Sequence, residues 1–102
     1  MKKIINGRLY DTDTAKEIDV YGNGLGPRDF RNYSETLYLK RTGEYFLCGE
    51  GGPMSKYARS CGGNSWSGGS GIIPLTAEEA REWGEKHMSA DDYIAAFGPV
   101  EE

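Results

Sequence analysis

The sequence predicts an α+β fold. We expect a small antiparallel β-sheet of two hairpins plus an edge strand, followed by two C-terminal α-helices, with a long Gly-rich loop. Two hairpin signals lie in the first half of the chain, a glycine-rich stretch follows, and two capped amphipathic segments end the sequence. Strands that precede helices are typical of α+β domains. With 102 residues the chain is too short for two domains, so we expect one α+β domain over residues 1–102.

The first expected element is an N-terminal hairpin. Residues 3–5 and 8–10 flank an Asn-Gly pair. This pair accepts the two positive φ angles of a type I′ turn and is the strongest short hairpin signal. Residues 14–21 carry two conflicting patterns, because their start fits a helix capping box whereas Ile18 and Val20 alternate as in a strand. We favour the strand, since so short a helix would be marginal.

The second hairpin is the clearest β signal in the sequence. Residues 35–41 alternate, with Leu37 and Leu39 on one face and Tyr38 on the other. A Thr-Gly turn then leads into residues 44–48, which return the chain. We expect this hairpin at the centre of the sheet.

Glycine dominates the stretch that follows. Residues 49–71 hold eight glycines in 23 positions and are expected to form the long loop. Residues 72–75 predict a short edge strand, because Pro74 cannot donate to the ladder of a central strand.

Two helices are expected at the C-terminal end. The first opens with a Thr-Ala-Glu-Glu capping box at residues 76–79 and places Ala80, Trp83 and His87 on one face. The second opens at Ser89 and stops at a Gly-Pro pair.

Charge is distributed unevenly along the chain. The net charge is −4, but residues 76–102 contain eight acidic residues against two basic ones, whereas residues 1–75 contain ten basic residues against eight acidic ones. An acidic face repels nucleic acid and attracts basic protein surfaces. The simpler alternative is a solvated helix face that keeps the protein soluble.

The composition also bears on location. Aromatic residues make up 12% of the chain, which argues against intrinsic disorder. The opening residues lack the apolar core of a signal peptide, and no stretch approaches the roughly 20 apolar residues of a membrane span. We therefore expect a cytoplasmic protein with reduced thiols and no membrane partner.

Catalytic and metal sites have little support in the sequence. The single histidine, His87, falls on the apolar face of its helix, and Cys48 and Cys61 lie thirteen residues apart, without the spacing of metal ligands. Nothing near either thiol would activate it as a nucleophile. The glycine-rich stretch does not match the P-loop spacing and contains Glu50. We expect no catalytic residue, no metal, no cofactor and no enzymatic activity; a small cysteine- or metal-dependent enzyme is the weakest alternative.

What remains is a binding surface. Tyr, Arg and Trp dominate interface hot spots, and the glycine-rich stretch contains one of each. For Trp66 the alternative is a core position beneath the loop. The predicted partner-binding residues are Tyr57, Arg59, Trp66, Glu78, Glu79, Glu82 and Glu85. The alternative is a small nucleic-acid- or nucleotide-binding module that uses Arg28, Arg31 and Lys56.

Three stretches carry a resemblance to known proteins: KKIINGRLYDTDTA at residues 2–15, ETLYLKRTGEYF at 35–46 and GEGGPMSKY at 49–57. They resemble small uncharacterised proteins of phages, plasmids and conjugative elements of Gram-positive bacteria, a setting that includes anti-CRISPR inhibitors. The resemblance implies a setting, a mobile element in the cytoplasm of a bacterial host cell, rather than a mechanism. In that setting we expect a mobile-element-encoded binding protein, an anti-defence (anti-CRISPR-like) inhibitor that binds a host effector protein stoichiometrically. A CRISPR effector is the partner expected first and nucleic acid the second.

Overall fold

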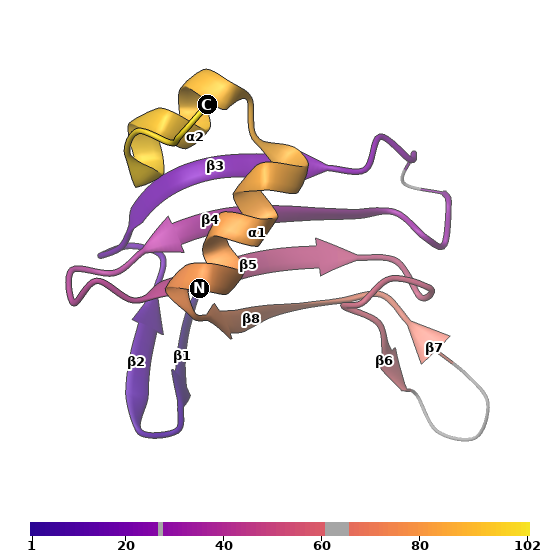
Figure 1. The fold of residues 1–102 in the computed structure, drawn as a ribbon. Helices are drawn as coiled ribbons and strands as arrows, with labels where there is room; N and C mark the ends of the chain where they lie inside the picture. Colours follow the sequence, from indigo (N-terminus) through magenta and orange to yellow (C-terminus); the bar gives the residue numbers. More distant parts are fainter. Residues whose placement is uncertain (27, 61–65) are drawn as a thin grey trace.

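The fold is α+β, as the sequence predicts. The computed structural model describes residues 1–26, 28–60 and 66–102 (Figure 1). Its central sheet is antiparallel throughout, with the strand order β3-β4-β5-β8. The four strands are β3 (Lys16–Gly22), β4 (Tyr33–Leu39), β5 (Tyr45–Gly51) and β8 (Gly69–Leu75). The helices α1 (Ala77–His87) and α2 (Ala90–Phe97) follow.

The predicted second hairpin is confirmed as the centre of the sheet. Strands β4 and β5 pair in continuous register from Tyr33↔Gly51 to Leu39↔Tyr45. The region that carried two conflicting patterns is strand β3, with a bulge between Glu17 and Asp19. Strand β8 lies at the edge of the sheet, as Pro74 predicts.

The N-terminal hairpin forms, but outside the central sheet. Strands β1 (Lys2–Ile5) and β2 (Arg8–Asp11) make a separate two-stranded sheet, with φ angles of 52° at Asn6 and 76° at Gly7 in the turn. Tyr10 packs edge-on against Phe46, with 5.5 Å between the ring centroids. The hairpin therefore covers a face of the sheet, and β3 takes the edge position beside β4.

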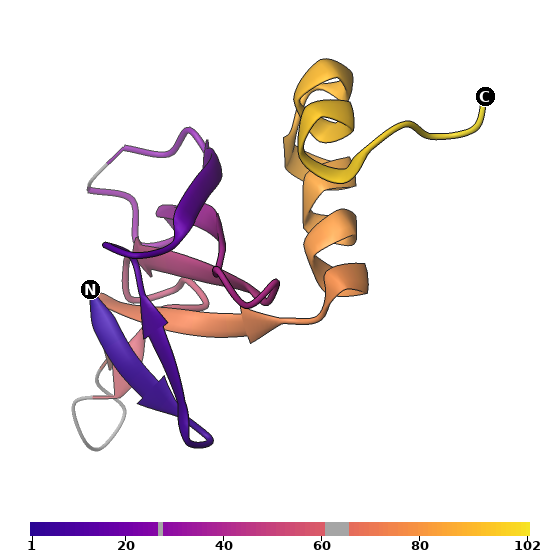
Figure 2. The ribbon, with the colours of Figure 1, turned by 90° about the vertical axis from the view of Figure 1, so that its left-hand side faces the viewer.

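The central sheet separates two apolar clusters. Leu37, Leu47, Ala80 and Trp83 form the core beneath the helices. On the opposite face, Tyr10, Phe46 and Ile72 form the core beneath the β1–β2 hairpin. Figure 2 shows the helices on one side of the sheet and the hairpin on the other. Alternation along β4 and β5 sends successive side chains to the two clusters in turn.

The glycine-rich stretch contains more regular structure than a single loop. Strand β5 extends to Gly51 and β8 begins at Gly69. Between them, β6 (Arg59–Ser60) pairs with β7 (Trp66–Ser67). The longest described part of this stretch without strands is the turn-rich segment 52–58, and residues 61–65 lie outside the described residues.

Both helices begin at the predicted caps. In α1, Thr76 Oγ1 accepts from the Glu79 amide at 3.1 Å and Glu79 Oε1 accepts from the Thr76 amide at 2.9 Å, which completes the capping box. In α2, Ser89 Oγ accepts from the Asp92 amide at 3.2 Å, and Gly98 ends the helix with a φ of 96°. No helix in the described residues is long and apolar enough to cross a membrane.

The capping box predicts a measurable stability effect. We expect Thr76→Ala to lower the free energy of unfolding by about 1 kcal/mol, because it orphans the Glu79 amide. Thr76→Ser retains the hydroxyl and should stay close to the wild type. Urea unfolding followed by circular dichroism measures both, and equal stability of the two variants would contradict the capping role.

Candidate functional site

Three segments meet at one end of the central sheet. They are the β3–β4 connection (residues 23–26 and 28–32), the segment 52–58 that follows β5, and residues 66–68 before β8; together we call them the loop end. The Met54 amide donates to the carbonyl oxygen of Phe30 at 2.7 Å, and the Gly52 amide donates to that of Asn32 at 2.8 Å. Two connections that are distant in sequence are thus joined by backbone hydrogen bonds.

Glycine is needed here because backbones approach one another closely. A Cβ at Gly52 would lie 2.7 Å from the carbonyl oxygen of Phe30, and one at Gly68 would lie 2.7 Å from that of Gly51. Real Cβ atoms do not tolerate such separations from a backbone oxygen. Close packing of the three segments therefore explains why glycine occupies these two positions. A phosphate-binding role is not needed to explain them.

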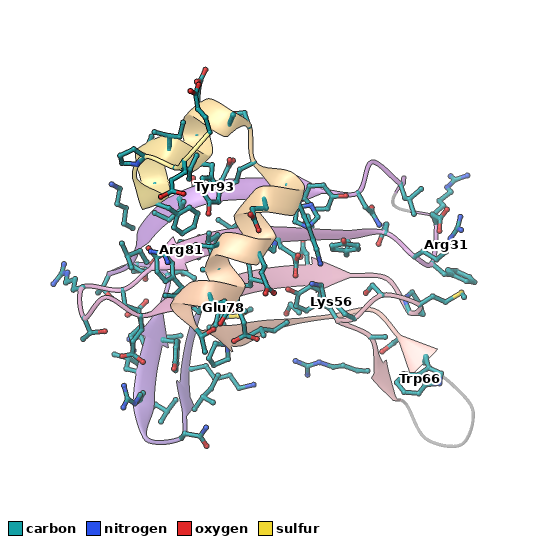
Figure 3. All side chains as sticks on the ribbon, viewed as in Figure 1. Arg31, Lys56, Trp66, Glu78, Arg81 and Tyr93 are labelled. Carbon is teal, nitrogen blue, oxygen red and sulfur yellow. The ribbon has the colours of Figure 1, made fainter. Side chains whose placement is uncertain are left out.

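The loop end exposes large apolar side chains. Phe30 is 61% exposed, Met54 67% and Trp66 59%, and Leu25 is exposed as well. Figure 3 shows Trp66 and Arg31 at the same end of the molecule. Trp66 therefore does not occupy a core position beneath the loop, which was the alternative that the sequence left open.

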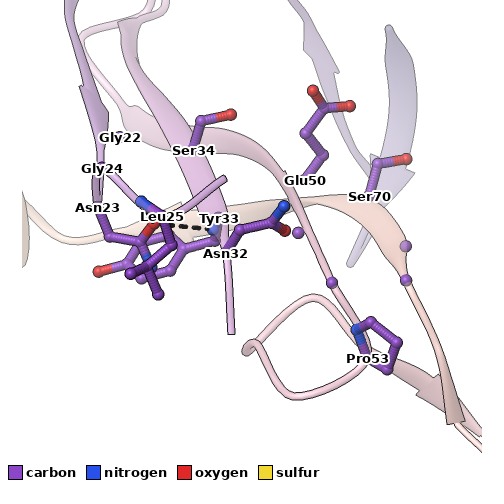
Figure 4. A pocket seen from close by; sticks show the side chains of 14 residues that line it. Gly22, Asn23, Gly24, Leu25, Asn32, Tyr33, Ser34, Glu50, Pro53 and Ser70 are labelled. Atoms are coloured by element: carbon purple, nitrogen blue, oxygen red, sulfur yellow. Dashed lines mark hydrogen bonds between the residues drawn. The ribbon is translucent and has the colours of Figure 1, made fainter. Parts of the chain in front are cut away.

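A groove runs along the same end of the sheet. Its volume is about 750 Å³, and its lining includes Asn23, Asn32, Ser34, Glu50 and Ser70 (Figure 4). Ser34, Glu50 and Ser70 are paired in register across β4, β5 and β8, so they form one polar row. Leu25 lines the groove too, which brings the apolar surface of the loop end to the edge of this polar row.

A buried carboxylate lies behind the loop end, on the helix side of the sheet. Glu35 is 1% exposed, yet three side chains bind it. Tyr57 Oη donates to Oε2 at 2.5 Å, Lys56 Nζ forms an ion pair with Oε2 at 2.6 Å, and Trp83 Nε1 donates to Oε1 at 3.0 Å. The four residues, which we call the Glu35 cluster, connect β4, segment 52–58 and α1.

Hydrogen bonding decides the charge state of Glu35. Burial raises the pKa of this carboxyl, but hydrogen bonds from Lys56, Tyr57 and Trp83 outweigh burial, so the pKa lies below its usual value. Burial, together with the hydrogen bond to Glu35, strongly raises the pKa of Tyr57. The cluster therefore consists of an ionised carboxylate, an ammonium group and two neutral donors, one of them a phenol.

His87 packs beside this cluster rather than forming a separate site. Its ring stacks on Tyr21 with 3.7 Å between centroids and contacts Trp83 edge-on at 5.2 Å. Burial lowers the pKa of His87, so the neutral ring is favoured at pH 7. Of the packed and the surface position, both compatible with the sequence, the structure shows the packed one.

The structure does not assemble one surface from all the predicted partner-binding residues. Trp66 belongs to the loop end, on β7, and Arg59 lies next to it, on β6, the strand that pairs with β7. Tyr57 was wrongly expected on the surface: it is 6% exposed, because its hydroxyl is bonded to buried Glu35.

The predicted acidic residues lie on α1, which both ribbon views place apart from β7 (Figures 1 and 2). They are all exposed: Glu78, Glu79, Glu82 and Glu85. Glu79 also serves as the capping-box acceptor. The acidic helix face and the apolar loop end are thus two separate surfaces.

The three residues predicted for the nucleic-acid-binding alternative differ in whether they form ion pairs within the protein. Lys56 is bound to Glu35, and Arg31 Nη2 forms an ion pair with Asp29 Oδ2 at 3.1 Å. Arg28 is exposed. Two of the three cations are therefore partly neutralised within the fold, which weakens the alternative.

Nucleophilic chemistry between Cys48 and His87 has no geometric basis. Cys48 packs with the cluster beneath the β1–β2 hairpin, whereas His87 lies on the helix side of the sheet. Burial also raises the pKa of the Cys48 thiol. Cys61 lies outside the described residues, and no group of His, Cys, Asp and Glu side chains suited to a metal ion occurs among those described.

Sequence reasoning missed two parts of this site, Met54 and the Glu35 cluster. A signal for Glu35 existed, since it shares the inward face of β4 with Leu37 and should have been recognised as a buried charge. Met54 had no comparable signal, because it belongs to no apolar stripe.

Comparisons of the chain with models of protein families, with curated proteins and with solved structures found no match.

A matched pair of glycine substitutions tests the packing of Tyr57. Gly49 pairs with Glu35 on one side and with Gly71 on the other. A Cβ at Gly49 would lie 2.6 Å from Cε2 of Tyr57, whereas one at Gly71 would meet nothing within 4 Å. We expect Gly49→Ala to lower the free energy of unfolding by about 1–3 kcal/mol. Gly71→Ala, the control, should change it by no more than about 0.5 kcal/mol. Equal effects in urea unfolding would contradict the packing.

The pKa shifts of His87 and Glu35 predict loss of stability on acidification. Folding lowers the pKa of His87, so its contribution is complete above the unfolded-state pKa of about 6.5 and is lost as the pH falls below it. The pKa of Glu35 is also lowered, so its contribution is lost only below an unfolded-state pKa of about 4.3. His87→Phe keeps a ring against Tyr21. This variant should abolish only the loss of stability that begins below about pH 6.5 and should leave the loss below about pH 4.3 unchanged. An unaltered profile between pH 7 and 5 in urea unfolding would contradict this assignment.

Proposed function

We propose that this chain is a non-enzymatic binding protein that recognises a protein partner with the loop end. The observation that supports the proposal is the exposure of Phe30, Met54 and Trp66 on segments whose backbones pack closely together. Exposed clusters of large apolar residues mark interaction sites, because each such residue gains free energy when a partner removes it from water.

The residue types at the loop end fit a protein interface. Aromatic residues, Met and Arg are enriched at such interfaces, and here Arg28, Arg31 and Arg59 accompany the apolar side chains. The side chain of Arg59 also donates to the carbonyl oxygen of Ser70 at 3.0 Å, which fixes it beside β8. The matching partner surface is therefore an apolar patch.

The resemblance described above extends the proposal to a partner class. It suggests a mobile-element-encoded anti-defence inhibitor that binds a host effector protein stoichiometrically, with a CRISPR effector as the first candidate. The exposed acidic face of α1 offers a second contact to such a protein, whose nucleic-acid channel is basic. This extension depends on the resemblance, whereas the binding role depends on the loop end.

The loop end is tested by the double variant Phe30→Ser/Trp66→Ser. Both side chains are exposed, so the fold should persist. Wild type and variant serve as baits in a nuclease-treated lysate of a Gram-positive bacterium, and the retained protein is then purified for direct titration. We expect the double variant to bind at least about 30-fold more weakly, which corresponds to one hot spot of about 2 kcal/mol.

The control is the charge reversal Glu78→Lys/Glu82→Lys/Glu85→Lys, which leaves the capping residue Glu79 intact. Equal binding by wild type and the Phe30/Trp66 variant would refute the loop end as the site. Binding lost only on charge reversal would place the site on α1. Retention of nucleic acid alone, released by nuclease or moderate salt, would favour the nucleic-acid-binding alternative.

A further inference from the structure

We infer that Lys56 and Glu35 are positioning residues for the loop end: their ion pair holds segment 52–58 so that Met54 is presented in a fixed orientation. The inference rests on the proposed function of the loop end as a binding surface. It assigns to the buried carboxylate of Glu35 the role of fixing the backbone that carries the exposed side chain of Met54.

Segment 52–58 has few other restraints. Its strand-free backbone forms the two hydrogen bonds to Phe30 and Asn32 and two short turns, in which the Ser55 amide donates to Gly52 at 3.0 Å and the Ala58 amide donates to Ser55 at 3.1 Å. The two turns shape the segment, and the bonds to Phe30 and Asn32 tie it to the β3–β4 connection, which is itself a loop. Anchoring to the strands of the sheet and to the helix layer therefore comes from side chains that reach those elements.

Lys56 and Tyr57 provide these anchors on the same carboxylate. Tyr57 is buried, whereas the side chain of Lys56 is 46% exposed, so the two residues contribute differently. The ammonium group of Lys56 also lies 5.4 Å from the ring centroid of Tyr33, which adds a cation–π contact to β4. Loss of Lys56 should loosen the segment while Tyr57 and Trp83 still satisfy Glu35.

A fixed segment matters for recognition because of entropy. Met54 lies two residues before Lys56 and has a flexible side chain. Holding its backbone before the partner arrives lowers the ordering cost of binding, which is the usual benefit of preorganisation. The same carboxylate accepts from Trp83 on α1, so the position of the segment is set relative to the helix layer as well.

The experiment uses the three methionines of the chain as probes. Met54 reports on the segment, Met88 on the end of α1 and Met1 on the N-terminal end. Methyl NMR and amide hydrogen exchange are measured on wild type, Lys56→Gln and Lys56→Arg. The matched control is Lys40→Gln, which removes an ion pair with Glu44 in the β4–β5 turn.

We expect Lys56→Gln to increase the mobility of the Met54 methyl and to speed exchange of the Gly52 and Met54 amides by about tenfold, while Met88 stays unchanged. Retention of the lysate protein captured by wild type should fall, and Lys56→Arg should restore both readouts. Lys40→Gln should leave the Met54 signal as in the wild type.

The outcomes separate the two proposals. An unchanged Met54 signal in Lys56→Gln overturns the positioning role, even if Phe30→Ser/Trp66→Ser abolishes binding. Faster exchange throughout the chain, α1 included, also overturns it, because the ion pair would then serve the whole fold. A looser segment with unaltered capture by the Phe30/Trp66 variant overturns the proposed function instead.

Discussion

The carboxylate of Glu35 is the point at which the sheet, α1 and the loop end are joined. Its two oxygens accept from Tyr57, Lys56 and Trp83, so a single side chain of β4 binds two elements that have no strand pairing with it. A buried ionised carboxylate is costly unless its hydrogen bonds are complete. Here they are complete, and Gly49 supplies the space that the Tyr57 ring requires.

The arrangement of the sheet favours the loop end, rather than a strand edge, as the proposed recognition surface. In β3, a bulge interrupts the ladder and Asp19 Oδ1 accepts from the Val20 amide at 2.8 Å. In β8, Arg59 donates to the carbonyl oxygen of Ser70, and Pro74 lacks an amide hydrogen. Edges modified in these ways resist the addition of a further strand. Apolar surface is instead exposed where loops converge, and loops on a rigid scaffold commonly carry function.

Two surfaces of different character result from this architecture. The exposed face of α1 is acidic, whereas the loop end combines apolar side chains with arginines. In the proposed binding role, the backbone of the loop end is fixed before a partner arrives, and the Glu35 cluster is the proposed source of that restraint. The proposed recognition surface is thereby tied to the core through the ion pair of Lys56 with Glu35, which is why substitutions at Lys56 and at Trp66 are expected to differ in their effect on local exchange.

The sequence by itself determined the elements whose signals are local. The Asn6-Gly7 turn, the alternation of β4 and the caps at Thr76 and Ser89 each depend on neighbouring residues, and all are present as predicted. Only the tertiary structure decided that the first hairpin covers a face of the sheet and that Tyr57 lies inside. The decisive contacts join residues far apart in the chain: Tyr57 and Trp83 lie 22 and 48 positions from Glu35. No short-range pattern encodes such separations, because they depend on how the completed elements pack.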